Sequence, residues 1–169
     1  APGPGEWVGR ARAVQAVGVR GGDHGAWGRG VEGGRAVVGA TGPDGLGSVR
    51  VYHAALLALV AAMDGDLSEA EHLLELCELP ADELGADTVA RMSATQALVA
   101  GNGEDAVRLA QAAVTAAERT DDLNLQGAMR LTLARVTDDP HEAEAARRLF
   151  ESKGNVAATG TIGLSSYRP

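Results

Sequence analysis

The chain has 169 residues, of which 45% are hydrophobic and 22% are charged, and its formal net charge is −8. These values are typical of a soluble globular protein of about one domain. Residues 47–158 hold 19 acidic and 9 basic side chains. This acidic surplus excludes direct binding of nucleic acid and docking on an anionic membrane, because both need a basic surface.

No apolar run reaches the roughly 20 residues of a membrane-spanning helix, and no charged and apolar leader opens the chain. Cys77 is the only cysteine, so no internal disulfide can form. Together these features predict a cytoplasmic protein.

Residues 1–46 contain 14 of the 23 glycines. Glycine this frequent raises the entropy cost of any helix or strand, and the short apolar pieces cannot build a core. We therefore predict a Gly/Pro-rich, disordered arm. Trp7 and Trp27 are its only large apolar side chains. We interpret them as incidentally exposed or loosely docked, and the alternative is that they anchor a partner.

The first helix is predicted to begin at Ser48 and to end at the Asp-Gly-Asp sequence of residues 64–66. Ser68 and Glu71 form a capping box for a second helix, which runs to about Glu78 and stops before Pro80. The apolar stripe of the first helix follows helical spacing and consists of Val49, His53, Leu56, Val60 and Met63, widened by Leu57 and Leu59.

Four more helices follow, each opened by a polar cap. The expected caps are Asp87, Asn102, Thr120 or Asp121, and Asp139 followed by Pro140 at the first helical position. The expected ends are Ala100, about Arg119, about Val136 and the C-terminal glycine Gly154.

Three stretches of the sequence repeat one pattern: GDLSEAEHLLEL at 65–76, GNGEDAVRLAQA at 101–112 and DDPHEAEAARRL at 138–149. Their anchoring alanines, Ala70, Ala106 and Ala143, are 36 and 37 residues apart. A period of this length predicts helix-turn-helix units that stack. We expect Ala106 to lie at a close helix crossing and Ala116 to lie nearer the surface.

The turn G-D-x-x-E-A resembles the tetratricopeptide repeat, with Ala70, Ala106 and Ala143 at its small position. The sequences DDLNLQGAMRLTLARV and EAEAARRLFESKGNVAA resemble the C-terminal repeats of large multidomain signalling ATPases, in which a nucleotide-cyclase or DNA-binding regulator module is joined to an ATPase core. The resemblance implies an all-α, right-handed αα-superhelix of about three repeats over 47–158. Residues 159–169 depart from the family's pattern, and we predict an irregular tail there. The resemblance also implies that the repeats belong to a larger regulatory protein.

The residues typical of catalytic or cofactor sites do not form a recognisable set. GGRAVVGATG at 33–42 has the glycine spacing of a phosphate loop, but Ala40 stands where the loop needs a lysine. The four histidines lie on different predicted elements without the spacing of a zinc site. We interpret Cys77 as a small core residue rather than a nucleophile. We therefore predict a protein that is not an enzyme and that needs no cofactor and no metal.

A stack of helical repeats offers a groove lined by the first helix of each pair. We expect a protein or peptide segment, or a neighbouring domain of the same parent chain, to bind there. The alternative is that the polar side chains in this groove are only solvated. The candidate partner-binding positions are His53, Arg91, Gln96, Asn124 and Arg130.

After Ala158 the sequence lacks the helix that would close the last repeat. We expect Leu149, Phe150 and Val156 to be only partly covered, and the uncapped C-terminal hairpin to allow self-association. Two alternatives for the whole chain stay open. One is a small α-helical enzyme of unknown reaction. The other is a repeat fragment flanked, at 1–46 and 159–169, by out-of-frame translated sequence.

Overall fold

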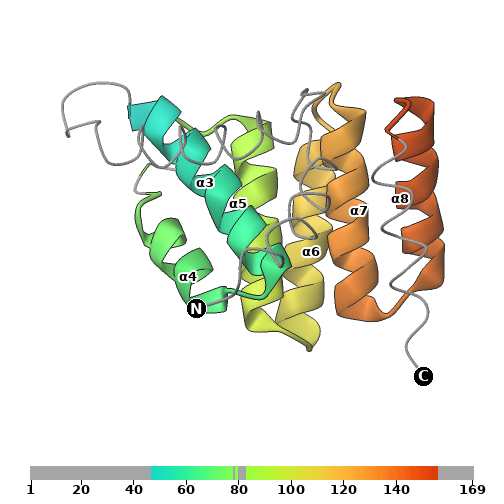
Figure 1. The fold of residues 1–169 in the computed structure, drawn as a ribbon, viewed down its shortest axis with the longest axis horizontal. Coiled ribbons are helices and arrows are strands. Elements are labelled where there is room, and N and C mark those ends of the chain that lie inside the picture. Colours follow the sequence, from blue (N-terminus) through green and yellow to red (C-terminus); the bar gives the residue numbers. More distant parts are fainter. Residues whose placement is uncertain (1–46, 78, 80–82, 156–169) are drawn as a thin grey trace, which may run out of the picture.

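A computed structural model describes residues 47–77, 79 and 83–155, and these residues form six helices and no strand (Figure 1). The all-α prediction is therefore confirmed for this part of the chain. The predictions for the arm at 1–46, for the tail at 159–169 and for Val156 lie outside the described residues. The helices are α3 (Gly47–Asp64), α4 (Leu67–Glu75), α5 (Ala86–Ala100), α6 (Glu104–Ala117), α7 (Leu123–Thr137) and α8 (Pro140–Ser152).

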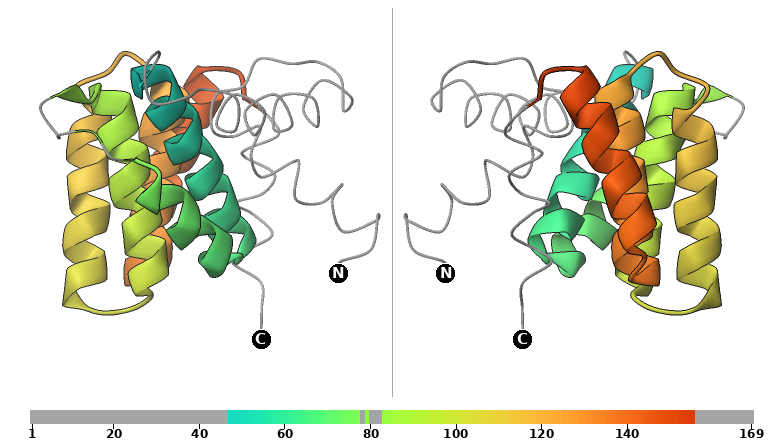
Figure 2. Two further views of the ribbon diagram at one scale, coloured as in Figure 1. Left: turned by 90° about the vertical axis from the view of Figure 1, so that its left-hand side faces the viewer. Right: turned by 90° about the vertical axis from the view of Figure 1, so that its right-hand side faces the viewer.

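Consecutive helices pair into three hairpins that stand side by side (Figure 1). The most extensive contacts lie within the hairpins α5–α6 and α7–α8. α3 contacts α4 and α5 equally, and the hairpins are joined chiefly through α3 with α5 and α6 with α7. Figure 2 views the stack from its two sides, with α3 and α4 nearest in one view and α8 nearest in the other. The stack therefore has two different ends.

The caps of α4 and α5 differ from the predicted ones. Asp66, not Ser68, caps α4, because its carboxylate accepts a hydrogen bond from the backbone amide of Glu69 at 3.2 Å. Ser68 lies inside the first turn of that helix. Gly85 is the cap residue of α5, so Asp87, the predicted cap, also lies in the first turn. In both places the helix is capped two residues earlier than the sequence pattern indicated.

The starts of α6 and α7 are also shifted. Gly103 precedes α6 in place of Asn102, with a φ of 135° that favours glycine. Asp122 caps α7 in place of Thr120 or Asp121, and its carboxylate accepts hydrogen bonds from the backbone amides of Asn124 and Leu125 at 3.0 and 3.2 Å. A single carboxylate thus satisfies two amides that would otherwise lack partners.

Both ends of α8 are as predicted. The carboxylate of Asp139 accepts a hydrogen bond from the amide of His141 at 2.8 Å, and Pro140 occupies the first turn. Gly154 follows the helix with a φ of 74°. Its amide donates to the carbonyl of Glu151, and the next amide donates to the carbonyl of Phe150, which is the Schellman termination of a helix.

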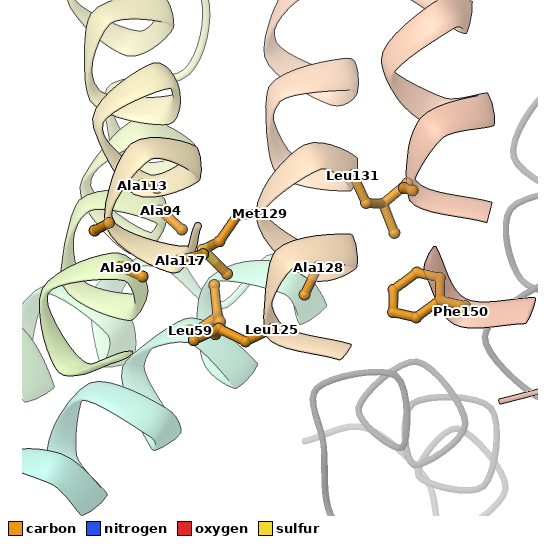
Figure 3. Close-up of a cluster of buried hydrophobic side chains, with 12 residues drawn as sticks. Leu59, Ala90, Ala94, Ala113, Ala117, Leu125, Ala128, Met129, Leu131 and Phe150 are labelled. Atoms are coloured by element: carbon orange, nitrogen blue, oxygen red, sulfur yellow. The ribbon is translucent and has the colours of Figure 1, made fainter. Parts of the chain in front are cut away.

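The core between the hairpins consists mainly of small side chains (Figure 3). Ala106, the expected crossing residue, is only 1% exposed. Ala116 was expected nearer the surface, and this is wrong, because it is 6% exposed and belongs to the main cluster. Small side chains at the crossings let the helix backbones approach closely. The main cluster contains Leu59, Ala90, Ala94, Ala113, Ala116, Ala117, Leu125, Ala128, Met129, Leu131, Ala146 and Phe150.

Phe150 is the largest fully buried side chain in the described residues, so the expectation that it is only partly covered is wrong. Its ring lies against Gly127 of α7, where an added Cβ would come within 2.8 Å of the ring. The missing side chain of Gly127 thus makes the space that the ring fills. Leu149, beside it in the sequence, is half-buried as expected.

Candidate functional site

Arg91, a predicted partner-binding residue, is held inside the chain. It is only 4% exposed, and its Nη1 donates to the carboxylate of Asp87 at 3.0 Å. Its guanidinium carbon lies 4.9 Å from the centre of the Tyr52 ring on α3. The cation–π contact ties α5 to α3, and the ion pair, which lies within α5, holds the guanidinium in place. Arg91 therefore acts as a structural residue between two hairpins.

His53 lies next to the same aromatic ring. Its imidazole meets the ring of Tyr52 edge to face, with the centroids 5.4 Å apart. Nδ1 lies 2.8 Å from the carbonyl oxygen of Val49, so Nδ1 carries the proton that the carbonyl accepts. His53 is half-buried. The structure thus brings His53 and Arg91 together around Tyr52.

Arg130 also makes ion pairs within the chain. Its guanidinium lies between Glu118, at 2.7 Å, and Glu142, at 2.9 Å. Glu118 ends α6 and Glu142 lies in the first turn of α8, so the arginine links three helices. Its side chain is 28% exposed. Like Arg91, it contributes to the packing of hairpins.

Gln96 and Asn124 remain as the other predicted positions. Gln96 is exposed on α5. Asn124 is half-buried in the first turn of α7, and its Oδ1 accepts a hydrogen bond from Nδ2 of Asn155 at 3.2 Å. Of the five candidates, Gln96 is therefore the side chain most open to a partner.

Cys77 is half-buried between α3 and α4. Its thiol donates to the carbonyl of Leu73 at 3.5 Å and lies 3.9 Å from that of Val51. Burial raises the pKa of the Cys77 thiol to about 11. The thiol therefore keeps its proton at neutral pH, whereas a nucleophilic cysteine reacts as the thiolate.

In the part of the chain that the structure describes, no group of three or more His, Cys, Asp and Glu residues could hold a metal ion. Among the same residues, no helix has the length and apolarity to span a bilayer.

The apolar stripe predicted for the first helix covers only part of the buried face of α3. Leu57 and Leu59 are buried, but Val49 is 37% exposed and His53, Leu56, Val60 and Met63 are half-buried. The other buried residues of α3 are Val51, Ala54, Ala55, Ala58 and Ala62. Hydrophobicity alone did not separate the two faces. The run of small residues did mark the tightly packed face, and this signal was overlooked.

We call the members of that stripe that are not fully buried the α3 stripe: Val49, His53, Leu56, Val60 and Met63. The side chains of Leu56, Val60 and Met63 pack against the main core cluster. The stripe contains no Asp, Glu, Lys or Arg, although 22% of the chain is charged. An apolar surface of this kind on one side of a helix is typical of a contact face.

The outward face of α8 is the opposite in character. Arg147 donates to Glu144 at 2.6 and 2.7 Å and also pairs with Glu151. Arg148 donates to Glu144 at 3.2 Å. Hydrogen bonds from Arg147 and Arg148 lower the pKa of the Glu144 carboxyl to about 2. This end of the stack therefore presents paired charges to solvent.

No family model matches the chain, and no curated protein or solved structure matches it at a significant level.

Proposed function

We propose that the chain is a non-catalytic protein–protein interaction module of the tetratricopeptide-like kind. The hairpins would form a right-handed αα-superhelix of about three repeats. The module would be the C-terminal repeat segment of a larger regulatory or signalling protein, linked to an ATPase or a transcription regulator. Its partner would be a protein, a peptide segment or a neighbouring domain of the parent chain.

The observation that carries the proposal is the agreement between the sequence period and the hairpins. Ala70 and Ala106 are buried near the start of the second helix of their hairpins, at 0% and 1% exposure. Ala143 occupies the matching place in α8 and is half-buried. Each repeated segment therefore begins the second helix of one hairpin. Stacked units with this organisation bury a shared core and leave extended surfaces for partners.

The polar side chains divide into two groups that bear on this proposal. Arg91 and Arg130 are occupied by carboxylates of the same chain. His53, Gln96 and Asn124 are the remaining candidates for partner contacts. The surplus of 10 acidic charges over residues 47–158 favours a basic partner, because complementary charge accelerates association and improves specificity.

A selection from a displayed library of Lys- and Arg-rich peptides, with the full chain as bait, would test the proposal. We expect a peptide whose affinity, measured by calorimetry, falls as salt rises. Gln96→Ala should weaken binding about tenfold, which corresponds to ~1.4 kcal/mol. Ser68→Ala, at an exposed position on α4, is the matched control. If the library yields no specific binder, or if both variants bind alike, the proposed surface is wrong.

A further inference from the structure

The turn between α5 and α6 contains the one Asn-Gly sequence of the chain. α5 ends at Ala100 and α6 begins at Glu104, so the turn consists of Gly101, Asn102 and Gly103, all of them exposed. The chain has two further asparagines, and neither is followed by glycine. The carboxamide of an asparagine is an electrophile that the backbone nitrogen of the next residue can attack. Glycine in that next place hinders the attack least, because it has no side chain.

Both reacting groups of this turn are unengaged. In the part of the chain that the structure describes, the amide of Gly103 donates to no acceptor, although its carbonyl accepts a hydrogen bond from the amide of Val107 at 3.0 Å. Over the same residues, no hydrogen bond holds the carboxamide of Asn102. Apart from the adjacent residues, a Cβ added to Gly103 would meet no heavy atom within 4 Å. The nitrogen of Gly103 therefore has an open approach to the side chain that precedes it.

Two comparable sites in the described residues are held by hydrogen bonds. Gly65 follows an aspartate at the end of α3, but its amide donates to the carbonyl of Ala62 at 3.1 Å. Asn124 lies in the first turn of α7, and the amide after it, that of Leu125, donates to the carboxylate of Asp122 at 3.2 Å. A hydrogen-bonded amide keeps its proton and its orientation, so it is a poor nucleophile. The α5–α6 turn differs from both sites in having its amide free.

We propose that Asn102 is a deamidation site, at which the turn is converted to a mixture of aspartate and isoaspartate. The backbone nitrogen of Gly103 gives up its proton to water and forms a bond to Cγ of Asn102. The side-chain nitrogen leaves as ammonia, and a cyclic succinimide remains. One water molecule then opens the ring. Attack on the side-chain carbonyl gives aspartate, and attack on the main-chain carbonyl gives isoaspartate, without any oxidant or reductant.

The two products change the turn differently. Aspartate adds one negative charge to a chain whose net charge is already −8. Isoaspartate adds the same charge and also carries the main chain through its Cβ, which lengthens the connection between α5 and α6 by one methylene. Ala106, close to this turn, is 1% exposed in the packed hairpin, so the longer connection should displace the first turn of α6. The modification goes beyond the proposed function, since it needs no partner.

The test incubates the full chain from neutral to mildly alkaline pH and follows its tryptic peptides by mass spectrometry. Cleavage after arginine places Asn102 in the peptide 92–108 and Asn124 in the peptide 120–130. We expect the amide-to-acid mass increase at Asn102 and not at Asn124, with release of ammonia and a rate that rises with pH. In the folded chain, the rate should stay within about tenfold of that in the free peptide 92–108, a difference of no more than about 1.4 kcal/mol in activation free energy.

Asn102→Gln is the matched control, because its longer side chain closes a six-membered ring much more slowly, and it should stay unconverted. Asn102→Asp carries the new charge on an unaltered main chain. The isoaspartate form, separated by ion exchange, should therefore melt below Asn102→Asp in circular dichroism.

Three results would overturn the proposal. The first is a folded chain that stays intact while the free peptide converts. The second is equal conversion at Asn102 and Asn124, which would show that the free amide of the turn does not direct the reaction. The third is conversion of Asn102→Gln at the rate of the parent chain. An isoaspartate form that melts together with Asn102→Asp would refute the predicted displacement of α6.

Discussion

The first and last helices of the stack finish it in opposite ways. α8 turns Ala146 and Phe150 inward and presents arginines and glutamates outward. α3 turns its small residues inward, and the α3 stripe on its other side is apolar, with Val49 exposed and Leu56, Val60 and Met63 packed against the main core cluster. Both helices are amphipathic or nearly so, but only α8 has a polar face toward solvent. The comparison shows that the outer face of the terminal helix decides how a helical stack ends: a charged face can remain in contact with solvent, whereas an apolar face is less favourable there.

This comparison changes the expectation drawn from the sequence about the ends. The C-terminal hairpin was expected to lack a cap, because the sequence after Ala158 does not continue as a helix. In the structure, Phe150 is covered by Gly127 of the preceding helix, and the charged face of α8 itself meets solvent. A terminal repeat with a polar outer face needs no additional helix. Self-association through that hairpin stays an untested prediction.

The largest expected effect concerns Phe150. Phe150→Ala removes a fully buried ring and leaves a cavity beside Gly127, so the free energy of unfolding should fall by about 3–5 kcal/mol. Val49→Ala, at the other end of the stack, removes exposed methyl groups and should change it by no more than about 0.5 kcal/mol. Urea unfolding followed by circular dichroism measures both. Equal losses would show that the two ends do not differ as described.

The next effect concerns the middle hairpin, α5–α6, where small side chains let the helices pack closely. Ala106→Leu places three extra carbons at a helix crossing and should cost about 1–3 kcal/mol. Ala112→Leu is on the same helix but exposed, and it should be nearly neutral. Thermal unfolding of the two variants makes the comparison. Similar melting temperatures for the two variants would show that the α5–α6 crossing can accommodate a leucine side chain at position 106.

The sequence was sufficient to predict the six helices, but it did not identify all of the residues that cap them. The repeated alanines and the Gly and Pro positions predicted six helices and the C-terminal glycine of α8, because these signals depend on local backbone geometry. The observed caps are Asp66 and Asp122, whereas Ser68 and Thr120 were predicted, because several polar residues that can cap a helix lie at each turn. Which of them caps the helix depends on where the chain turns.

The packing partners could not be predicted in the same way. From the sequence alone, Gly127 is expected only to destabilise its helix. Its contact with the ring of Phe150 in the folded chain explains why a glycine is needed there. Arg91 and Arg130 read as surface groups, because their carboxylate partners and the ring of Tyr52 come together only in the folded chain. The α3 stripe has the periodicity of a core face. Its exposure depends on where α4 and α5 pack, which the sequence of α3 does not contain.

A third prediction concerns Cys77, at the α3–α4 end. Burial raises the pKa of its thiol from 9.0 to about 11. Below pH 9 the folded and unfolded thiols are both protonated. Above it the unfolded thiol ionises first, so stability should be lost as the pH rises from 9 to 11. We expect a loss of about 1–2 kcal/mol, less than the full shift implies, because the thiol is partly exposed.

Chemical unfolding at several pH values between 8 and 11 would measure this loss. Cys77→Ser supplies the comparison, because a hydroxyl does not titrate in this range, and its stability should fall less steeply. Other groups titrate in both the parent chain and Cys77→Ser, so their contributions to the pH dependence of stability cancel when the two curves are subtracted. Parallel pH curves for the two proteins would rule out the proposed burial of the thiol.

The smallest effect concerns the charged face of α8. Hydrogen bonds from Arg147 and Arg148 lower the pKa of Glu144 from 4.5 to about 2. The stabilisation is therefore complete above pH 4.5 and is lost as the pH falls toward 2. Because Glu144 lies at the surface, salt should screen it, the Debye length being only about 3 Å at 1 M. Glu144→Gln should unfold at slightly lower urea at pH 7 and low salt. Glu71→Gln, on the outward side of α4, is the control for removing one acidic charge. If Glu144→Gln matches the parent chain at pH 7, the paired charges of α8 keep this end soluble without stabilising it.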